Sequence, residues 1–139
     1  MLEKELIELS EMQLARSKEI LQEIPILMEH SAYNTAINRA YYAAFHAMKA
    51  IEALDRYDSK KHSGVISYFR MKYVRTGVFP DELSEIIGEL QEARADSDYN
   101  IIIRFNAEDA ENYYQGAVRF CSVVEAYLKR QYAEDESSV

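Results

Sequence analysis

Four polar side chains follow one another at helical spacing in the segment 38–50, and two of them suit phosphate chemistry. They are Arg39, Tyr42, His46 and Lys49. At about 100° per residue all four share one side of a helix. The apolar stripe of that segment lies on the opposite side and comprises Tyr33, Ile37, Tyr41, Ala44, Met48 and Ile51. The arginine can stabilise charge on a phosphodiester, and the histidine can exchange a proton near neutral pH. An ordinary solvent-exposed helix face fits the same spacing.

A second candidate group follows at residues 60–62, where Lys60 and Lys61 precede His62. Free backbone N–H groups at a helix start can bind an anion, so these side chains are candidates for phosphate binding. A structural role for His62 in a capping turn is the alternative. The surrounding segment 59–80 contains no acid and carries five positive charges, namely Lys60, Lys61, Arg70, Lys72 and Arg75. It is either a phosphate-binding island or a solvated face that offsets acidic neighbours.

Composition limits the classes of protein that the chain can represent. A length of 139 residues suits one domain, and a hydrophobic content of 48% is enough for a core. The net charge of −8 argues against a general nucleic-acid coat protein, which would be basic overall. No run of about 18 apolar residues predicts a membrane span. The single cysteine, Cys121, suits a reducing cytoplasm. No metal-ligand spacing or Gly-rich phosphate loop is present, so we expect neither metal nor cofactor.

The periodicity predicts an all-α fold, an antiparallel up-and-down bundle of four main helices and one shorter helix. The expected helices cover residues 2–24, 31–54, 62–74, 79–95 and 106–133. Pro25 is expected to end the first helix, Ser31 to cap the second and Asn106 to cap the last. The segment 96–105 reads as a short strand or a buried loop. We expect one domain over residues 1–133 and a disordered tail over 134–139.

Several ordered motifs give the chain a resemblance to a known family. The segment 38–50 reads NRAYYAAFHAMKA and resembles the second-helix signature of HEPN domains. Later landmarks follow in the same order: KHSGV at 61–65, VRTG at 74–77, and residues 90–99 with Arg94, Ala95, Asp98 and Tyr99. The similarity covers about residues 6–128. It implies a helical bundle that commonly dimerises and that often has a small nucleotidyltransferase as its partner, in a toxin–antitoxin arrangement.

The resemblance leaves two functions open. Many HEPN proteins cleave RNA without metal through an arginine and a histidine separated by four to six residues, a spacing that Arg39 and His46 satisfy. In ribonuclease members the motif usually lies on a later helix, with a polar residue rather than Ala40 after the arginine. One function is therefore a homodimeric, non-catalytic module that docks a nucleotidyltransferase or binds RNA or a nucleotide. The other is an endoribonuclease with Arg39 and His46 as catalytic residues across a dimer. The expected binding residues are Tyr42, Lys49, Lys60, Lys61 and His62.

Overall fold

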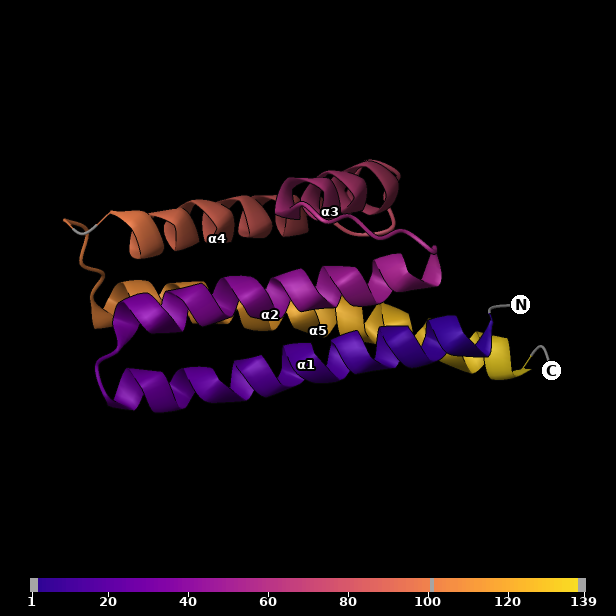
Figure 1. Cartoon of the computed structure of the whole chain (residues 1–139), viewed down its shortest axis with the longest axis horizontal. Helices are drawn as coiled ribbons and strands as arrows, with labels where there is room; N and C mark the ends of the chain where they lie inside the picture. Colours follow the sequence, from indigo (N-terminus) through magenta and orange to yellow (C-terminus); the bar gives the residue numbers. More distant parts are fainter. Residues whose placement is uncertain (1–2, 101, 138–139) are drawn as a thin grey trace.

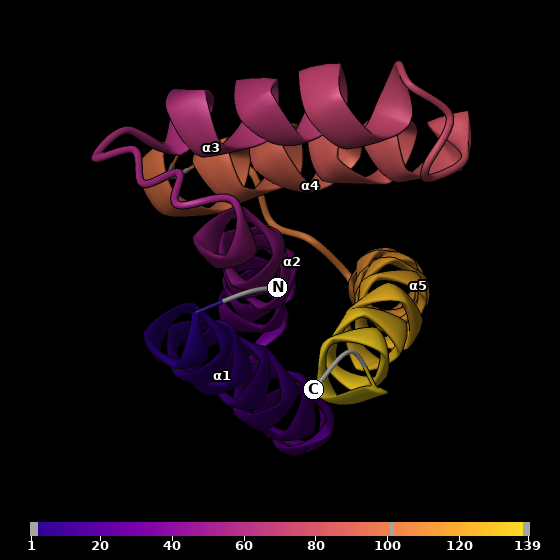
Figure 2. The ribbon, with the colours of Figure 1, turned by 90° about the vertical axis from the view of Figure 1, so that its right-hand side faces the viewer.

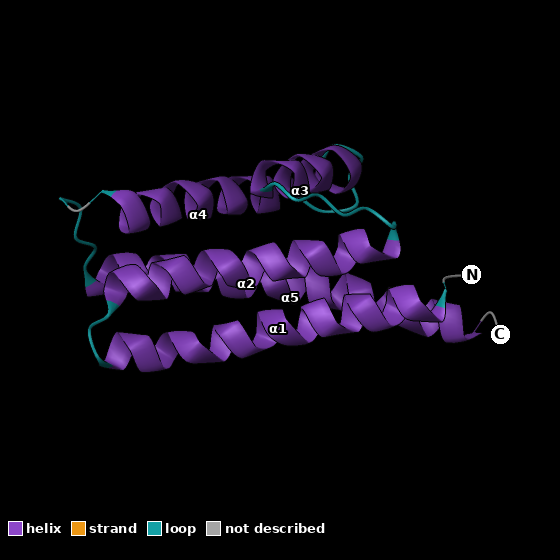
Figure 3. Ribbon diagram, in the orientation of Figure 1, coloured by secondary structure: helices purple, strands orange, loops and turns teal. Residues whose placement is uncertain are grey.

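The computed structural model describes residues 3–100 and 102–137, and over these the chain is helical apart from its connections (Figure 3). The elements are α1 (Lys4–Glu29), α2 (Tyr33–Leu54), α3 (His62–Phe69), the π-helical turn η1 (Arg70–Val74), α4 (Asp81–Tyr99) and α5 (Ala107–Ser137). The predicted all-α class is therefore confirmed. None of these helices is long and apolar enough to cross a membrane.

The four long helices run alternately up and down, and α2 lies at their centre (Figure 1). α2 contacts α1, α3, α4 and α5. Seen end-on, α1 and α5 lie on one side of α2, and the layer of α3 and α4 lies on the other (Figure 2). Among the described helices, none covers the side of α2 that faces away from α5 (Figure 2). This open side is where a half-buried functional face can form.

Small side chains explain why α2 can be surrounded so closely. Six of its alanines are buried, at positions 36, 40, 43, 44, 47 and 50. On α1, Ser10 and Ser17 are fully buried and donate hydrogen bonds of 2.7 Å to the carbonyl oxygens of Ala50 and Ala43. These bonds give the buried serine hydroxyls a partner, and they form because no bulkier side chain keeps the two helices apart. Ser10 and Ser17 are therefore points of close contact between α1 and α2.

The connection between α1 and α2 differs from the sequence prediction. Helix α1 continues through Pro25 to Glu29. Proline removes one backbone donor, but Pro25 is exposed and the preceding Ile24 is fully buried, so packing continues past it. The link to α2 is consequently short, and Ser31 adopts a left-handed φ of 58° instead of capping α2. The cap position is Ala32, which makes no side-chain capping bond.

The segment 96–105 is neither a strand nor a buried loop over its described residues. α4 extends to Tyr99, and the exposed fraction of Ile102 is 86%; Ile101 lies outside the described residues. Asn34 of α2 fixes the connection by donating to the carbonyl of Ile103 at 3.3 Å and accepting from the N–H of Phe105 at 3.1 Å. The connection is therefore held by its backbone polar groups, while its apolar side chain at 102 faces solvent.

The last helix begins as predicted and ends later. Asn106 accepts a hydrogen bond from the N–H of Asp109 at 2.8 Å, and Asp109 accepts one from the N–H of Asn106 at 3.0 Å. This reciprocal pair satisfies two donors at the start of α5. α5 then continues to Ser137, so residues 134–137 are helical where a disordered tail was expected.

Candidate functional site

The four side chains of the predicted stripe do lie on one side of α2, but they are half-buried. Arg39, Tyr42, His46 and Lys49 are all intermediate in exposure. Residues of α1 lie along one edge of this stripe, and residues of α3 and α4 lie along the other. We call this half-buried stripe between its two rows of neighbours the α2 furrow; because it is half-buried, electrostatic interactions are stronger there than on an open surface.

His46 is oriented by a contact with α1 that the sequence did not reveal. Its Nδ1 lies 2.7 Å from Oε1 of Gln13. An amide oxygen only accepts, so Nδ1 must carry the proton and donate. In the neutral ring Nε2 then has a free lone pair, and no hydrogen-bond partner for it occurs among the described residues. Gln13 thus selects the tautomer in which Nε2 can accept a proton.

The surroundings of His46 favour its neutral form. Burial lowers the pKa of the imidazole below its usual value near 6.5, and the cations Arg16, Lys49 and Arg39 lower it further. No carboxylate is paired with the ring among the described residues. At neutral pH the ring is therefore uncharged and able to act as a base.

Arg39 contacts two of its neighbours on α2. Its guanidinium lies 5.2 Å from the centre of the Tyr42 ring, one turn further along α2. Its Nε and Nη2 donate to Oδ1 of Asn38 at 3.2 and 3.0 Å. Within the described part of the chain, Arg39 has no acidic partner. Six residues lie between Arg39 and His46, which corresponds to about 10 Å along the helix axis.

His62 closes the furrow from the start of α3. Its ring centre lies 4.4 Å from that of Phe45 and 5.7 Å from that of Tyr42. Its Nδ1 shares a hydrogen bond of 3.1 Å with the hydroxyl of Tyr41, whose pKa burial raises to about 12. Burial, with Arg94 and Lys49 nearby, lowers the pKa of His62. The structure therefore brings His62, a separate candidate in the sequence, next to the α2 stripe.

Arg94 of α4 is a second cation at the site, and sequence reasoning did not single it out. It donates to the hydroxyl of Tyr42 at 3.0 Å and lies 5.5 Å from the ring centres of both Tyr41 and Tyr42. Its Nε is 3.0 Å from Asp98, which also accepts from Asn38 of α2. Arg94 is one of the landmarks of the family resemblance, and that was the available signal.

The other predicted binding residues are less closely grouped. Lys49 lies 5.9 Å from the ring centre of Phe45 and forms an ion pair of 3.2 Å with the exposed Asp58. Lys60 and Lys61 are exposed just before α3. Two further cations of the basic segment bind other elements: Arg70 donates to Ser84 of α4, and Lys72 pairs with Asp55. The segment 59–80 is thus not one basic surface.

The site that results combines an oriented neutral histidine, the three cations Arg39, Lys49 and Arg94, and several aromatic rings in one furrow. Cations and ring faces together are what single-stranded nucleic acids require, because the cations bind phosphates and the rings stack on bases. No cluster of three or more metal-ligating side chains occurs in the part of the chain that the structure describes. The fold and the site together define a class of small helical bundle with cations and aromatic rings on one half-buried side of its central helix.

Comparison with known proteins agrees with this class. The profile of the HEPN domain matches residues 10–127. A protein of Methanocaldococcus jannaschii named “Putative toxin MJ0605” is 33% identical over 124 residues, which cover 89% of this chain and 87% of that protein. A UPF0332 protein of Thermotoga maritima is 29% identical over 114 residues, which cover 82% and 86%. The chain belongs to the HEPN domain family, as the resemblance in its sequence indicated.

Proposed function

We propose that this HEPN protein binds single-stranded RNA in the α2 furrow, as one component of a toxin–antitoxin-like pair. The observation that carries the proposal is the joint placement of Arg39, Tyr42, His46 and His62, which lie in one furrow although they come from two helices. The guanidinium can bind a phosphate, and the exposed parts of the rings can stack on bases. The toxin name of a relative supports the biological context.

Binding is tested with a fluorescent single-stranded RNA by anisotropy. Arg39→Ala should weaken binding about tenfold, because a charge-assisted contact contributes about 1.5 kcal/mol. Arg130→Ala, on the exposed surface of α5, is the matched control and should bind like the unaltered protein. Equal affinities for all three proteins, or no binding to any RNA, would overturn the proposal.

A second candidate function is RNA cleavage without metal, and the Gln13–His46 hydrogen bond favours it. His46 would remove the proton of a ribose 2′-hydroxyl through Nε2. That oxygen would then attack the adjacent phosphorus while Arg39 stabilises the added charge on the phosphate. The 5′-oxygen would leave and take a proton from water, and the protonated His46 would return its proton to the solvent. The products would be a 2′,3′-cyclic phosphate and a 5′-hydroxyl.

Cleavage is tested with a labelled RNA in the presence of a chelator. His46→Ala should reduce the rate by about 10²–10⁴-fold, the usual contribution of a general base. His30→Ala, in the exposed connection after α1, should leave the rate unchanged. An RNA with a 2′-deoxy sugar at the scissile position should stay intact. If the unaltered protein cleaves no RNA yet binds it, the non-catalytic reading is the correct one.

The assembly belongs to the same proposal. We expect a homodimer, in which two furrows can serve one RNA, and a small nucleotidyltransferase as the second component of the pair. Light scattering at micromolar concentration should give about twice the chain mass of 16.1 kDa. If the mass corresponds to one chain at every concentration, the furrow of a single chain can still bind RNA, but a site shared by two chains is ruled out.

A further inference from the structure

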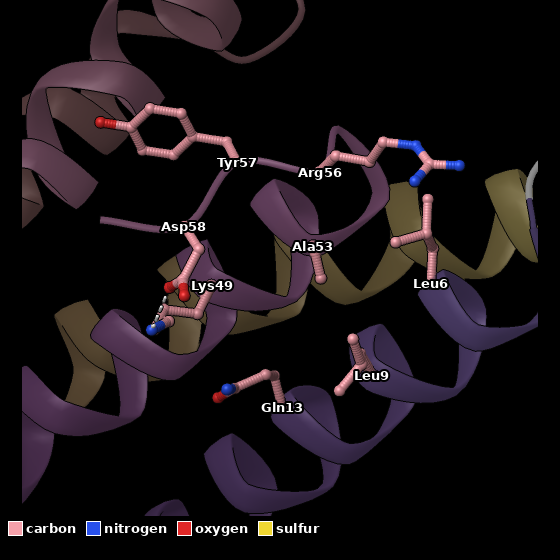
Figure 4. A pocket seen from close by; sticks show the side chains of 8 residues that line it. All are labelled: Leu6, Leu9, Gln13, Lys49, Ala53, Arg56, Tyr57 and Asp58. Atoms are coloured by element: carbon pink, nitrogen blue, oxygen red, sulfur yellow. Dashed lines mark hydrogen bonds and ion pairs between the residues drawn. The ribbon is translucent and has the colours of Figure 1, made fainter. Parts of the chain in front are cut away.

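The side of α2 that carries the polar stripe continues past Lys49 to the end of the helix. The positions 39, 42, 46, 49 and 53 alternate in steps of three and four, so Ala53 lies on the same side, and Arg56 follows in the turn after the helix ends at Leu54. There the stripe opens into a cavity of about 390 Å³ between α1, α2 and the loop that follows α2 (Figure 4). This volume lies within the range of about 300–1,000 Å³ that is typical of small-molecule sites.

One wall of the cavity is apolar. Leu6 and Leu9 of α1 face Ala53 of α2 across it (Figure 4). The exposed fraction of Leu9 is 52%, so apolar surface at the rim is open to solvent. A flat, weakly polar ring such as a nucleobase would cover this wall and remove its surface from water.

Two cations lie at the cavity, and both are held only by exposed acids. Lys49 pairs with Asp58, whose side chain is 80% exposed. Arg56 pairs with Glu3, whose side chain is 58% exposed. Ion pairs with such exposed partners contribute little to stability. A phosphate group can therefore replace the Asp58 carboxylate at Lys49 with charge-assisted hydrogen bonds, while Arg56 lies at the opposite end of the cavity (Figure 4).

Gln13 joins the cavity to the furrow. Its Oε1 accepts from His46, while its side chain also lines the cavity beside Lys49 (Figure 4). The amide NH₂ group has no hydrogen-bond partner among the described residues. It is a donor for an acceptor atom of whatever occupies the cavity. A chain that passes His46 would thus reach the cavity without leaving the stripe.

We propose that this cavity binds one nucleotide unit of a single-stranded RNA. The base lies against Leu6, Leu9 and Ala53, and its phosphate pairs with Lys49 in place of Asp58. The inference rests on the proposed function in one respect, because it assigns this nucleotide to the strand that occupies the furrow. Binding of a free mononucleotide to the cavity does not depend on that assignment.

The test uses the full chain and two measurements. First, each of the four ribonucleoside 5′-monophosphates is titrated into ¹⁵N-labelled protein, and amide shifts are followed at Gln13, Ala53 and Tyr57. Second, RNA affinity is measured by anisotropy for Ala53→Phe, which fills the cavity, and for Ala126→Phe, the same change on the exposed surface of α5. Leu9→Glu and Leu9→Gln form a second pair, because only the glutamate repels a phosphate.

We expect at least one mononucleotide to shift the cavity amides, and Ala53→Phe to abolish the shifts and weaken RNA binding about tenfold. Leu9→Glu should also weaken binding, while Leu9→Gln and Ala126→Phe should not. The inference is overturned if no mononucleotide shifts these amides, or if RNA affinity is unchanged in both Ala53→Phe and Leu9→Glu. Failure of the proposed function looks different: mononucleotides would still shift the cavity amides, but no RNA would bind.

Discussion

His46 shows how a single side chain acquires chemistry from groups distant in the sequence. Its position on α2 was evident from spacing, but its tautomer is set by Gln13, which lies 33 residues earlier on α1. Sequence spacing describes one helix at a time, so it cannot show which residue of a neighbouring helix meets the ring. The same limit applies to Arg94 and Tyr42, which are 52 residues apart and form a hydrogen bond.

The titration of His46 provides a test at this scale. Because burial and nearby cations lower its pKa, the ring should titrate below 6.5 when followed by NMR. Lys49→Gln should raise the midpoint only in part, since burial is the larger cause. Lys18→Gln, on the exposed face of α1, should leave it unchanged. A midpoint at or above 6.5 would contradict the neutral-base assignment.

The lowered pKa of His46 also determines how this residue affects folding stability as the pH changes. A histidine whose folded pKa lies below its unfolded value binds fewer protons in the folded state. His46 therefore contributes stability that is present above about pH 6.5 and lost as the pH falls through the folded pKa. Activity that needs the neutral ring should decline over the same acidic range.

Glu52 offers a second residue-scale prediction. It is 1% exposed, its Oε2 has no hydrogen-bond partner, and burial raises its pKa to about 9. The folded state keeps it protonated, so stability falls as pH rises from about 4.5 towards 9. Glu52→Gln should stabilise the protein by about 1–3 kcal/mol at pH 8 and have no effect at pH 4, as measured by urea unfolding. The exposed Glu92→Gln should not change stability at either pH.

At the scale of elements, helix existence was predictable and helix ends were less so. The buried periodicity of α2 and the cap at Asn106 are local signals, and both predictions are confirmed. The prediction that Pro25 ends α1 was wrong, because packing of Ile24 against the core outweighs one missing backbone hydrogen bond. The end of α4 moved to Tyr99 because Asp98 in its last turn accepts hydrogen bonds from Asn38. Such contacts between helices cannot be predicted from the residue spacing within one helix.

The Asn106 cap provides the element-scale test. Asn106→Ala removes the bond to the N–H of Asp109 at the start of α5 and should lower the free energy of unfolding by about 1 kcal/mol. Asn112→Ala, at an exposed position inside α5, removes no cap and should leave stability the same or slightly higher. Equal losses for the two variants in urea unfolding would show that the cap contributes nothing.

At the scale of the whole molecule, the chain carries a net charge of −8, whereas the furrow on α2 presents cations. Long-range forces repel a polyanion, so binding depends on a few close contacts within one Debye length, about 10 Å at 0.1 M salt. Arg39, Lys49 and Arg94 are the cations of the furrow that can meet phosphates. A protein of this kind differs from a basic coat protein, which would gather many phosphates at once.

The number of phosphates contacted can be counted from salt dependence. Each phosphate neutralised on a single strand contributes about −0.7 to the slope of log affinity against log salt. Three cations predict a slope of about −2 between 50 and 200 mM NaCl, and Arg39→Ala should make it shallower by about 0.7. Arg130→Ala should not alter it, because that side chain lies on α5, away from the furrow. A slope steeper than about −4, unchanged by Arg39→Ala, would mean that RNA binds a broad surface elsewhere, and the furrow would lose its assigned role.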